Sequence, residues 1–134
     1  MSANNRIVSI VDDDPATTIF FNEALRSIPG ITVFTFTDPI LALEHFQDNG
    51  YAYVAVISDF KMPGLNSMEF LKKIKDLNRF VRTILMTAFE IDDTLFQEYT
   101  KKKIINGLLQ KPIGLHDRIK EVNTQLDSYE VKKK

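Results

Sequence analysis

The stretch RIVSIVDDDPATT, residues Arg6 to Thr18, does most to decide the fold of this 134-residue chain. Its first six residues form a nearly continuous apolar run, which is typical of a strand buried on both faces of a parallel sheet. Three aspartates follow directly, and Pro15 suits the first turn of a helix. A buried strand that leads through a polar turn into a helix is the repeating unit of α/β proteins.

Four more strand-like runs follow, and segments with helical spacing separate them. They are ITVFTF (Ile31–Phe36), YVAVIS (Tyr53–Ser58), RTILMT (Arg82–Thr87) and IINGLLQ (Ile104–Gln110). Strand and helix alternate five times, which predicts an α/β fold with one parallel sheet covered by helices on both faces. The expected architecture is a doubly wound (βα)5 flavodoxin-like sandwich with strand order 2-1-3-4-5.

The helical segments are predicted from their caps and apolar stripes. Asp38 and Asn66 suit N-cap positions, and helices are expected near residues 15–28, 39–46, 66–77, 92–101 and 115–129. The apolar positions expected to face the sheet are Phe20, Ala24, Leu25, Ile28, Leu43, Phe46, Phe70, Leu71, Ile74, Leu77, Leu115, Ile119, Val122, Leu126 and Tyr129.

The composition limits the class of protein. Hydrophobic residues make up 44% of the chain, the net charge is −1 and cysteine is absent, which excludes disulfides and thiol catalysis. No apolar run approaches the roughly 20 residues that span a bilayer, and the N-terminus lacks the plan of a signal peptide. We expect a cytoplasmic protein without direct nucleic-acid or membrane contacts. A single domain, 1–134, is predicted, with its core at about 6–129 and a frayed basic tail at 130–134.

Polar residues follow four of the five strands. Ligands of doubly wound sheets bind outside the carboxyl ends of the strands, so these side chains should meet in one crevice. The residues are Asp12, Asp13 and Asp14 after the first strand, Asp59 after the third, Thr87 after the fourth and Lys111 after the fifth.

This set of side chains suits phosphoryl chemistry on a metal ion. Clustered carboxylates raise one another's pKa values unless a cation neutralises them, and oxygen ligands favour a hard ion such as Mg²⁺. A lysine and a threonine can hold phosphoryl oxygens, and an aspartate beside the ion can become an aspartyl-phosphate. Taken singly, each residue has another explanation: Asp14 as the helix cap, Asp59 opening a turn, Thr87 bonding a buried carbonyl, and Lys111 at the surface.

The stretches IVDDDP, SDFKMPG, MTA and QKPI, in this order, resemble the signature sequences of the response-regulator receiver domain, the CheY-like module of two-component signalling. The resemblance runs from about Arg6 to Tyr129. It implies that Asp59 accepts a phosphoryl group from the phosphohistidine of a sensor histidine kinase or a phosphotransfer protein. It also implies that Asp13 binds Mg²⁺ directly and Asp12 largely through water.

Further roles follow from the same resemblance. The backbone carbonyl of Lys61 would be another Mg²⁺ ligand, and Thr87 and Lys111 would grip the phosphoryl oxygens. Such a module is not an enzyme beyond its own phosphorylation and slow dephosphorylation. It signals through contacts with a downstream effector protein or output domain. The resemblance leaves open whether two copies of the chain form a homodimer. Lys61 and Phe89 would flank the path of the water that attacks the phosphoryl group, and Phe89 is expected to slow that attack.

The sequence departs from the family at the fifth strand. Leu108 stands where members usually carry a Tyr or Phe that swings inward on activation, and Ile104 and Ile105 replace a usual Gly-Ala. The phosphorylation residues are therefore complete, while the usual readout through the fourth helix and fifth strand is in doubt.

Two other functions share part of this pattern. The first is a receiver-like scaffold that binds partners without being phosphorylated, which the complete acid, hydroxyl and lysine set disfavours. The second is a haloacid-dehalogenase-type phosphohydrolase, which needs a second acid where this chain has Lys61. His45 and His116 are predicted to be surface residues and not a metal or catalytic pair.

Overall fold

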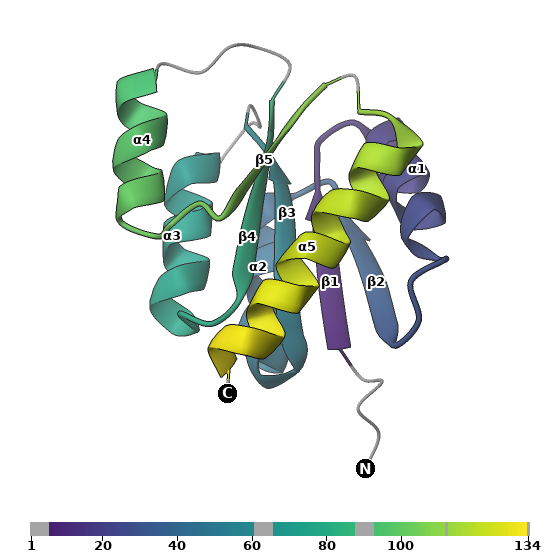
Figure 1. Cartoon of the computed structure of the whole chain (residues 1–134), viewed down its shortest axis with the longest axis horizontal. Helices are drawn as coiled ribbons and strands as arrows, with labels where there is room; N and C mark the ends of the chain where they lie inside the picture. Colours follow the sequence, from purple (N-terminus) through teal and green to yellow (C-terminus); the bar gives the residue numbers. More distant parts are fainter. Residues whose placement is uncertain (1–5, 61–65, 88–92, 112, 134) are drawn as a thin grey trace.

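The structure, a computed structural model, describes residues 6–60, 66–87, 93–111 and 113–133. It is a wholly parallel sheet of five strands in the order β2-β1-β3-β4-β5, as the sequence predicts (Figure 1). The strands are β1 (Arg6–Val11), β2 (Ile31–Phe36), β3 (Tyr53–Asp59), β4 (Arg82–Thr87) and β5 (Gly107–Gln110). This is the flavodoxin-like fold, with the reversal of strand order between β1 and β3.

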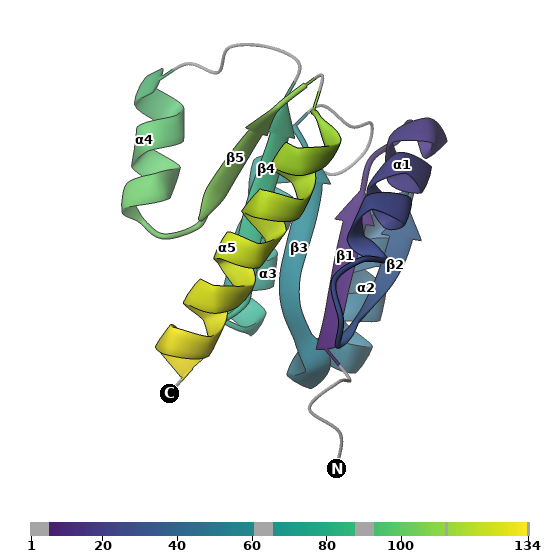
Figure 2. The same ribbon diagram turned by 45° about the vertical axis from the view of Figure 1, so that its right-hand side comes forward.

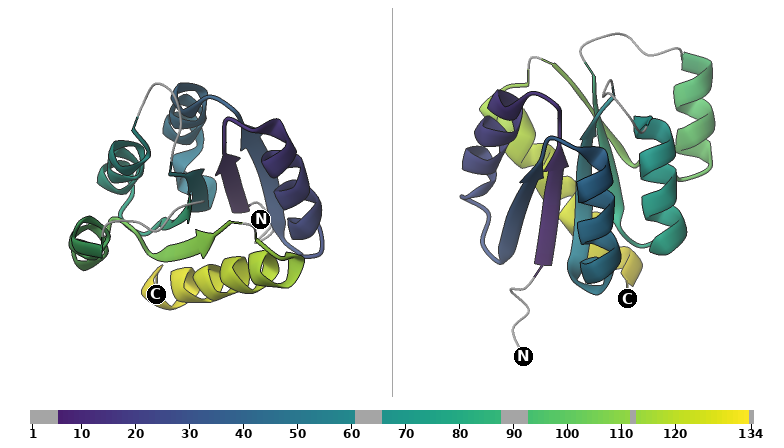
Figure 3. Two further views of the ribbon diagram at one scale, coloured as in Figure 1. Left: turned by 90° about the horizontal axis from the view of Figure 1, so that it is seen from above. Right: turned by 180° about the vertical axis from the view of Figure 1, so that it is seen from behind.

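Helices cover both faces of the sheet, because right-handed crossovers lead to opposite faces on the two sides of the reversal. The helices are α1 (Pro15–Leu25), α2 (Pro39–Asn49), α3 (Ser67–Leu77), α4 (Asp93–Lys101) and α5 (Leu115–Lys133), and a 3-10 turn, η1, spans Gly50–Ala52. Helices α1 and α5 lie on one face, and α2, α3 and α4 lie on the other (Figures 2 and 3). Within the described residues, no helix is long and apolar enough to cross a membrane.

The core has two parts, one on each face of the sheet. Strand β3 is buried along all seven residues, and its apolar side chains are divided between the two parts. Ile57 packs in the cluster that α1 and α5 cover, while Val56 packs in the cluster that α2 and α3 cover. Because both faces of the central strands must be apolar, these strands appear in the sequence as continuous apolar runs.

The first three helices begin at the predicted caps. The carboxylates of Asp14 and Asp38 and the side-chain oxygen of Asn66 each accept a hydrogen bond from the backbone N–H two residues later, at 3.0, 2.9 and 2.8 Å. Such a cap satisfies one of the N–H groups that a helix leaves unpaired at its start. The starts of α1, α2 and α3 are therefore set by local sequence.

The apolar face of α1 differs from the prediction by one residue. Phe20 is 56% exposed, and Phe21 is buried at 1% instead. Phe21 lies three and four residues before Ala24 and Leu25, so all three share the face toward the sheet. The prediction of Phe20 as a core residue was therefore wrong, because it fitted the stripe with a spacing of four and five.

Two more predicted core residues are exposed because they lie at helix ends. Leu77, the last residue of α3, is 54% exposed, and Leu115, the first residue of α5, is 60% exposed. Both continue an apolar stripe in sequence. Each stripe nevertheless extends past the part of its helix that rests on the sheet.

The bounds of two elements also differ. Strand β5 begins at Gly107 and not at Ile104. The backbone of Ile104 makes other hydrogen bonds instead of strand pairing. The Thr83 hydroxyl donates to the Ile104 carbonyl, and the Ile104 N–H donates to the Tyr99 carbonyl at 2.8 Å. Ile104 and Ile105 are buried beneath α4 as connecting residues. Helix α5 continues to Lys133, so the tail predicted to fray is helical that far.

His45 is half-buried, whereas the sequence predicts a surface residue. Its Nδ1 lies 2.7 Å from the Tyr53 hydroxyl, and its ring centroid lies 4.4 Å from that of Phe34. Burial raises the pKa of Tyr53 to about 12, although a hydrogen bond with Ser9 opposes the rise, so the hydroxyl stays protonated. His45 thus packs between α2 and the sheet, whereas His116 is exposed as predicted.

Candidate functional site

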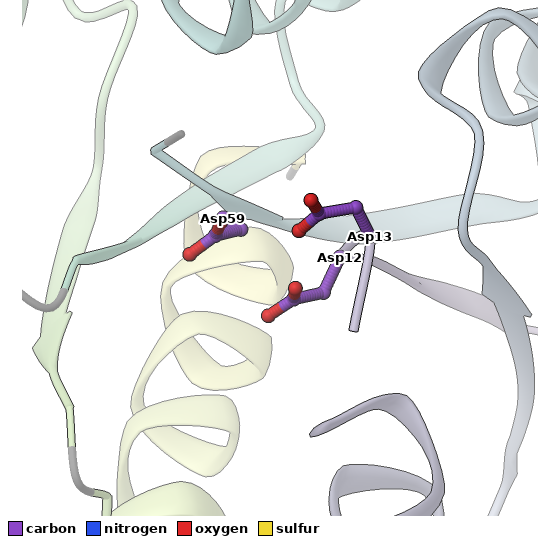
Figure 4. A group of neighbouring side chains, drawn as sticks. All are labelled: Asp12, Asp13 and Asp59. Carbon is purple, nitrogen blue, oxygen red and sulfur yellow. The ribbon is translucent and has the colours of Figure 1, made fainter. Parts of the chain in front are cut away.

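The predicted polar residues meet at one end of the sheet. Asp12 and Asp13 follow β1, Asp59 ends β3, Thr87 ends β4 and Lys111 follows β5. Figure 4 shows the three aspartate side chains gathered at the ends of β1 and β3. The crevice expected from the strand order therefore holds the residues that the sequence assigned to it.

The carboxylates of Asp12, Asp13 and Asp59 are close enough to share a cation. One oxygen from each lies within 4.8 Å of the others. Oxygen ligands on opposite sides of Mg²⁺ lie roughly 4 Å apart, so small side-chain movements would bring all three to one ion. Asp12 is fully buried and Asp59 is 7% exposed, while Asp13 is exposed. A hard divalent ion therefore fits this group, with its solvent side open to water or phosphate oxygens.

Lys111 joins two of the carboxylates. Its Nζ lies 2.8 Å from Oδ2 of Asp12 and 2.9 Å from Oδ1 of Asp59. A single ammonium group faces three carboxylates, so the group keeps a net negative charge. That charge is what a divalent cation would neutralise.

Burial and the neighbouring charges act in opposite directions on the pKa values of Asp59 and Lys111. Burial raises the pKa of the Asp59 carboxyl, the hydrogen bond from Lys111 opposes the rise, and Asp12 adds to it. Burial alone would lower the pKa of Lys111, but its bonds to the two carboxylates outweigh burial and raise it. Lys111 is therefore a fixed positive charge, and the ionised form of Asp59 gains from any further cation.

Backbone contacts hold the strand ends in place. The Lys111 N–H donates to the Thr87 carbonyl at 2.7 Å, and the Phe60 N–H donates to the Met86 carbonyl, also at 2.7 Å. Thr87 is 2% exposed, at the end of β4. These bonds fix the end of β4 against Phe60, which follows β3, and Lys111, which follows β5.

The three consecutive aspartates have three different surroundings. Asp14 is exposed and caps α1, which confirms its alternative explanation as a helix cap. Asp12 has a positioning contact that the sequence analysis did not assign: its Oδ1 accepts a hydrogen bond from the Asp14 N–H at 2.9 Å. An aspartate that bonds the backbone two residues on is a common turn, so the spacing itself carried that signal. The Asp13 carboxylate has no hydrogen-bond or ion-pair partner among the described residues, so it can face a cation.

Two predicted site residues, Lys61 and Phe89, lie outside the described residues. The surface alternative for Lys111 is wrong, because its ammonium is engaged by two carboxylates. The Lys111 side chain is 24% exposed, so it is still reached by solvent.

Comparisons with known proteins agree with this architecture. The family model of the response regulator receiver domain matches residues 8–123. The "DNA-binding transcriptional regulator NtrC" of Escherichia coli (strain K12) is 27% identical over 124 residues, which cover 92% of this chain and 25% of that protein. The chain thus spans about a quarter of the length of that relative.

A shorter relative and a solved structure complete the comparison. The "Sporulation initiation phosphotransferase F" of Bacillus subtilis (strain 168) is 32% identical over 89 residues, or 66% of this chain and 69% of that one. A CheY-like response regulator receiver domain protein from Methanospirillum hungatei JF-1 has the same fold, with a TM-score of 0.83 at 20% identity, covering 95% of this chain and 98% of the other. The chain belongs to the family of response regulator receiver domains, the signalling modules of two-component systems.

Proposed function

We propose that this chain is a phosphorelay receiver that takes a phosphoryl group onto Asp59 in the presence of Mg²⁺. The observation that carries the proposal is the ammonium of Lys111, 2.9 Å from the Asp59 carboxylate and 2.8 Å from Asp12. It is a fixed cation beside the atom on which negative charge would accumulate. The donor would be the phosphohistidine of a histidine kinase or of a phosphotransfer protein.

The transfer needs positioning and charge neutralisation more than acid–base chemistry. An oxygen of Asp59 attacks the phosphorus in line, and the bond from phosphorus to the histidine nitrogen breaks, leaving a neutral imidazole after it takes a proton from solvent. Lys111 then pairs with a phosphoryl oxygen, and the Thr87 hydroxyl donates to another. Mg²⁺, when bound, supplies positive charge to the same oxygens.

The metal would be held by the three-carboxylate group. Asp13 is proposed as a direct ligand, because it is the exposed member and has no helix to cap. Asp12 contributes largely through water, since its two oxygens already accept bonds from Lys111 and from the Asp14 N–H. The backbone carbonyl of Lys61 is proposed as a further ligand.

Signalling is proposed to occur through protein contacts, with an effector protein or an output domain as the partner. The names of the relatives describe a DNA-binding transcriptional regulator and a phosphotransferase, which illustrates two kinds of output in the family. Leu108, at the position of the family's usual aromatic switch, is 39% exposed. A leucine has no ring to rotate, so we propose that readout relies on other residues.

The test of this function is phosphorylation by a small donor. Wild type incubated with acetyl phosphate and Mg²⁺ should gain a single phosphoryl group by intact mass, and chelation of the metal should prevent it. Asp59→Asn should gain none, whereas Asp48→Asn, at an exposed aspartate of α2, should react like wild type. An adduct that persists in Asp59→Asn would refute the assignment. Failure of wild type with every donor would favour the unphosphorylated scaffold.

A further inference from the structure

A second cavity, of about 590 Å³, lies at the end of the sheet opposite the aspartates. It is formed by the end of α3, the start of β4 and the connection from α4 to β5. Six of its lining residues are cationic: Lys72, Lys75, Arg79, Arg82, Lys102 and Lys103. One acid, Asp76, lines it as well.

This charge is concentrated in a chain whose net charge is only −1. Two of the cations have acidic neighbours: Lys72 lies 3.3 Å from Asp76, and Lys102 lies 3.0 Å from Glu98. Even with Asp76 and Glu98 set against the six cations, the lining residues and their paired acids keep a net positive charge. The cavity therefore keeps a strong positive potential, and an anion inside it would be attracted.

Arg82 is held in place by a side chain of α5. Its Nε donates to Oε1 of Gln125 at 2.8 Å, which fixes the side chain against α5. Burial lowers the pKa of Arg82, and the nearby Glu121 opposes that effect. The other guanidinium nitrogens have no hydrogen-bond partner among the described residues. A planar group held in this way suits the oxygens of a phosphate.

The walls of the cavity are held by side-chain bonds to the backbone. The Lys75 ammonium donates to the Val81 carbonyl at 2.6 Å, which fixes the turn from α3 to β4. The Asn106 side chain accepts from the Thr83 N–H at 2.9 Å, which fixes the approach to β5. A ligand would therefore meet a largely formed site, and less ordering would be needed on binding.

Arg79 and Lys103 complete the rim of the cavity, and neither forms an ion pair within the described part of the chain. The Arg79 guanidinium lies 5.0 Å from the centre of the Phe80 ring. Lys103 has a φ of 62°, a left-handed backbone that favours glycine and costs a lysine free energy. This backbone ends α4 as a helix C-cap, with the Lys103 N–H bonded to the Thr100 carbonyl at 3.0 Å, so the position from which Lys103 lines the cavity is fixed.

We propose that this cavity binds a small molecule that carries two or more phosphate groups. Its volume lies in the range of small-molecule sites, and Phe80 and Ile104 add apolar surface beside the cations. A nucleic-acid strand fits less well, because it needs a basic path along the surface, and the rest of this chain carries net negative charge. The site is independent of the phosphorylation proposed for Asp59.

The test uses tripolyphosphate and ATP as probes, titrated into the whole chain in the presence of EDTA. EDTA removes divalent ions, so neither probe can bind through a metal at the aspartates. Backbone amide resonances of Arg82, Lys103 and Asn106 should shift with saturation, while those of Asp12 and Thr87 should not. Tighter binding of ATP would indicate a nucleotide, and equal binding would indicate recognition of the phosphates alone.

Paired variants separate a built site from general attraction. The double variant Arg79→Gln/Lys103→Gln should lower the affinity for both probes by about tenfold or more, since each substitution removes a charged contact with the phosphates. Lys73→Gln with Lys101→Gln removes the same charge from exposed positions on α3 and α4 outside the cavity, and should keep the affinity within about twofold. Glutamine at position 103 has the same difficulty as lysine in adopting the left-handed backbone. Lys103→Gln should therefore leave the free energy of unfolding close to that of wild type.

Several results would overturn the proposal. Equal losses in the two double variants would show nonspecific attraction, and the absence of saturable binding would show no site. Shifts confined to Asp12 and Thr87 would place the anion beside Lys111 instead. Tighter binding of single-stranded DNA than of either probe would make nucleic acid the ligand.

Discussion

Asp13 and Asp14 are neighbours in sequence but differ in what their carboxylates contact. Asp13 lies in the three-carboxylate group, whereas Asp14 caps α1 through the Ala16 N–H at 3.0 Å. We predict that Asp13→Ala weakens Mg²⁺ binding by at least about tenfold, because it removes a direct ligand. Asp14→Ala should leave Mg²⁺ affinity within about twofold and lower the free energy of unfolding by about 1 kcal/mol. Metal titration and thermal unfolding of both variants measure the two effects. Equal losses of affinity would mean that the aspartates are assigned in the wrong order.

Asp59 should destabilise the metal-free protein at neutral pH. Its folded pKa is raised above the usual 3.8, chiefly by burial, so the folded state binds this proton more tightly than the unfolded state does. Its contribution to stability is then greatest below pH 3.8 and falls as the pH rises through 3.8 to the raised folded value. In EDTA at neutral pH, Asp59→Asn should therefore melt a few degrees above wild type.

The same reasoning fixes the control for this prediction. The advantage of Asp59→Asn should shrink as the pH is lowered toward 3.8, because the wild-type carboxyl then takes up its proton. Asp48→Asn, at an exposed position, should show no such dependence. A lower melting temperature for Asp59→Asn than for wild type in EDTA would show that the bond to Lys111 outweighs burial.

At the scale of elements, helix α1 offers two adjacent phenylalanines with opposite surroundings. Phe21 is 1% exposed and Phe20 is 56% exposed. Phe21→Ala should lower the free energy of unfolding by about 3–5 kcal/mol through lost burial and the cavity that remains. Phe20→Ala should change it by about 0.5 kcal/mol or less. Denaturant unfolding of the two variants makes the comparison, and similar losses would mean that α1 is rotated from the position described here.

That pair also shows where prediction from sequence succeeds and where it fails. The continuous apolar strands and the caps Asp14, Asp38 and Asn66 are local signals, so strand order and helix starts could be predicted. Which face of a helix meets the sheet depends on tertiary packing. The spacing alone therefore cannot tell which of two adjacent apolar residues, such as Phe20 and Phe21, is buried.

The candidate site could be located for a similar reason. Parallel strands end together, so residues that follow separate strands, such as Asp12, Asp59 and Lys111, must converge. The basic cavity had no such signal. The lysines at 101–103 look like an ordinary solvated run, and Lys102 and Lys103 meet Arg79 and Arg82 only in the folded chain. His45 was misplaced because its partner, Tyr53, comes from a neighbouring strand.

At the scale of the whole molecule, the two halves of the core share the same strands. Phe21 of α1 packs against one face of the sheet, and Phe46 of α2 packs against the other; each is 1% exposed. Because β1, β3 and β4 contribute to both halves, loss of either should weaken the whole sheet. Phe21→Ala and Phe46→Ala should each lower the melting temperature while unfolding remains a single transition by far-UV and near-UV circular dichroism. Separate transitions in either variant would show that the two faces unfold independently.

The central claim is that Asp59 accepts the phosphoryl group, and chemical mapping of that group tests it most directly. The chain is treated with acetyl phosphate and Mg²⁺ and then reduced with borohydride, which converts an aspartyl-phosphate to homoserine. Peptide mass spectrometry then locates the changed residue. We predict homoserine at position 59 alone, and none when Mg²⁺ is chelated. Homoserine at Asp12 or Asp13, or a phosphoryl group that borohydride does not displace, would contradict the claim.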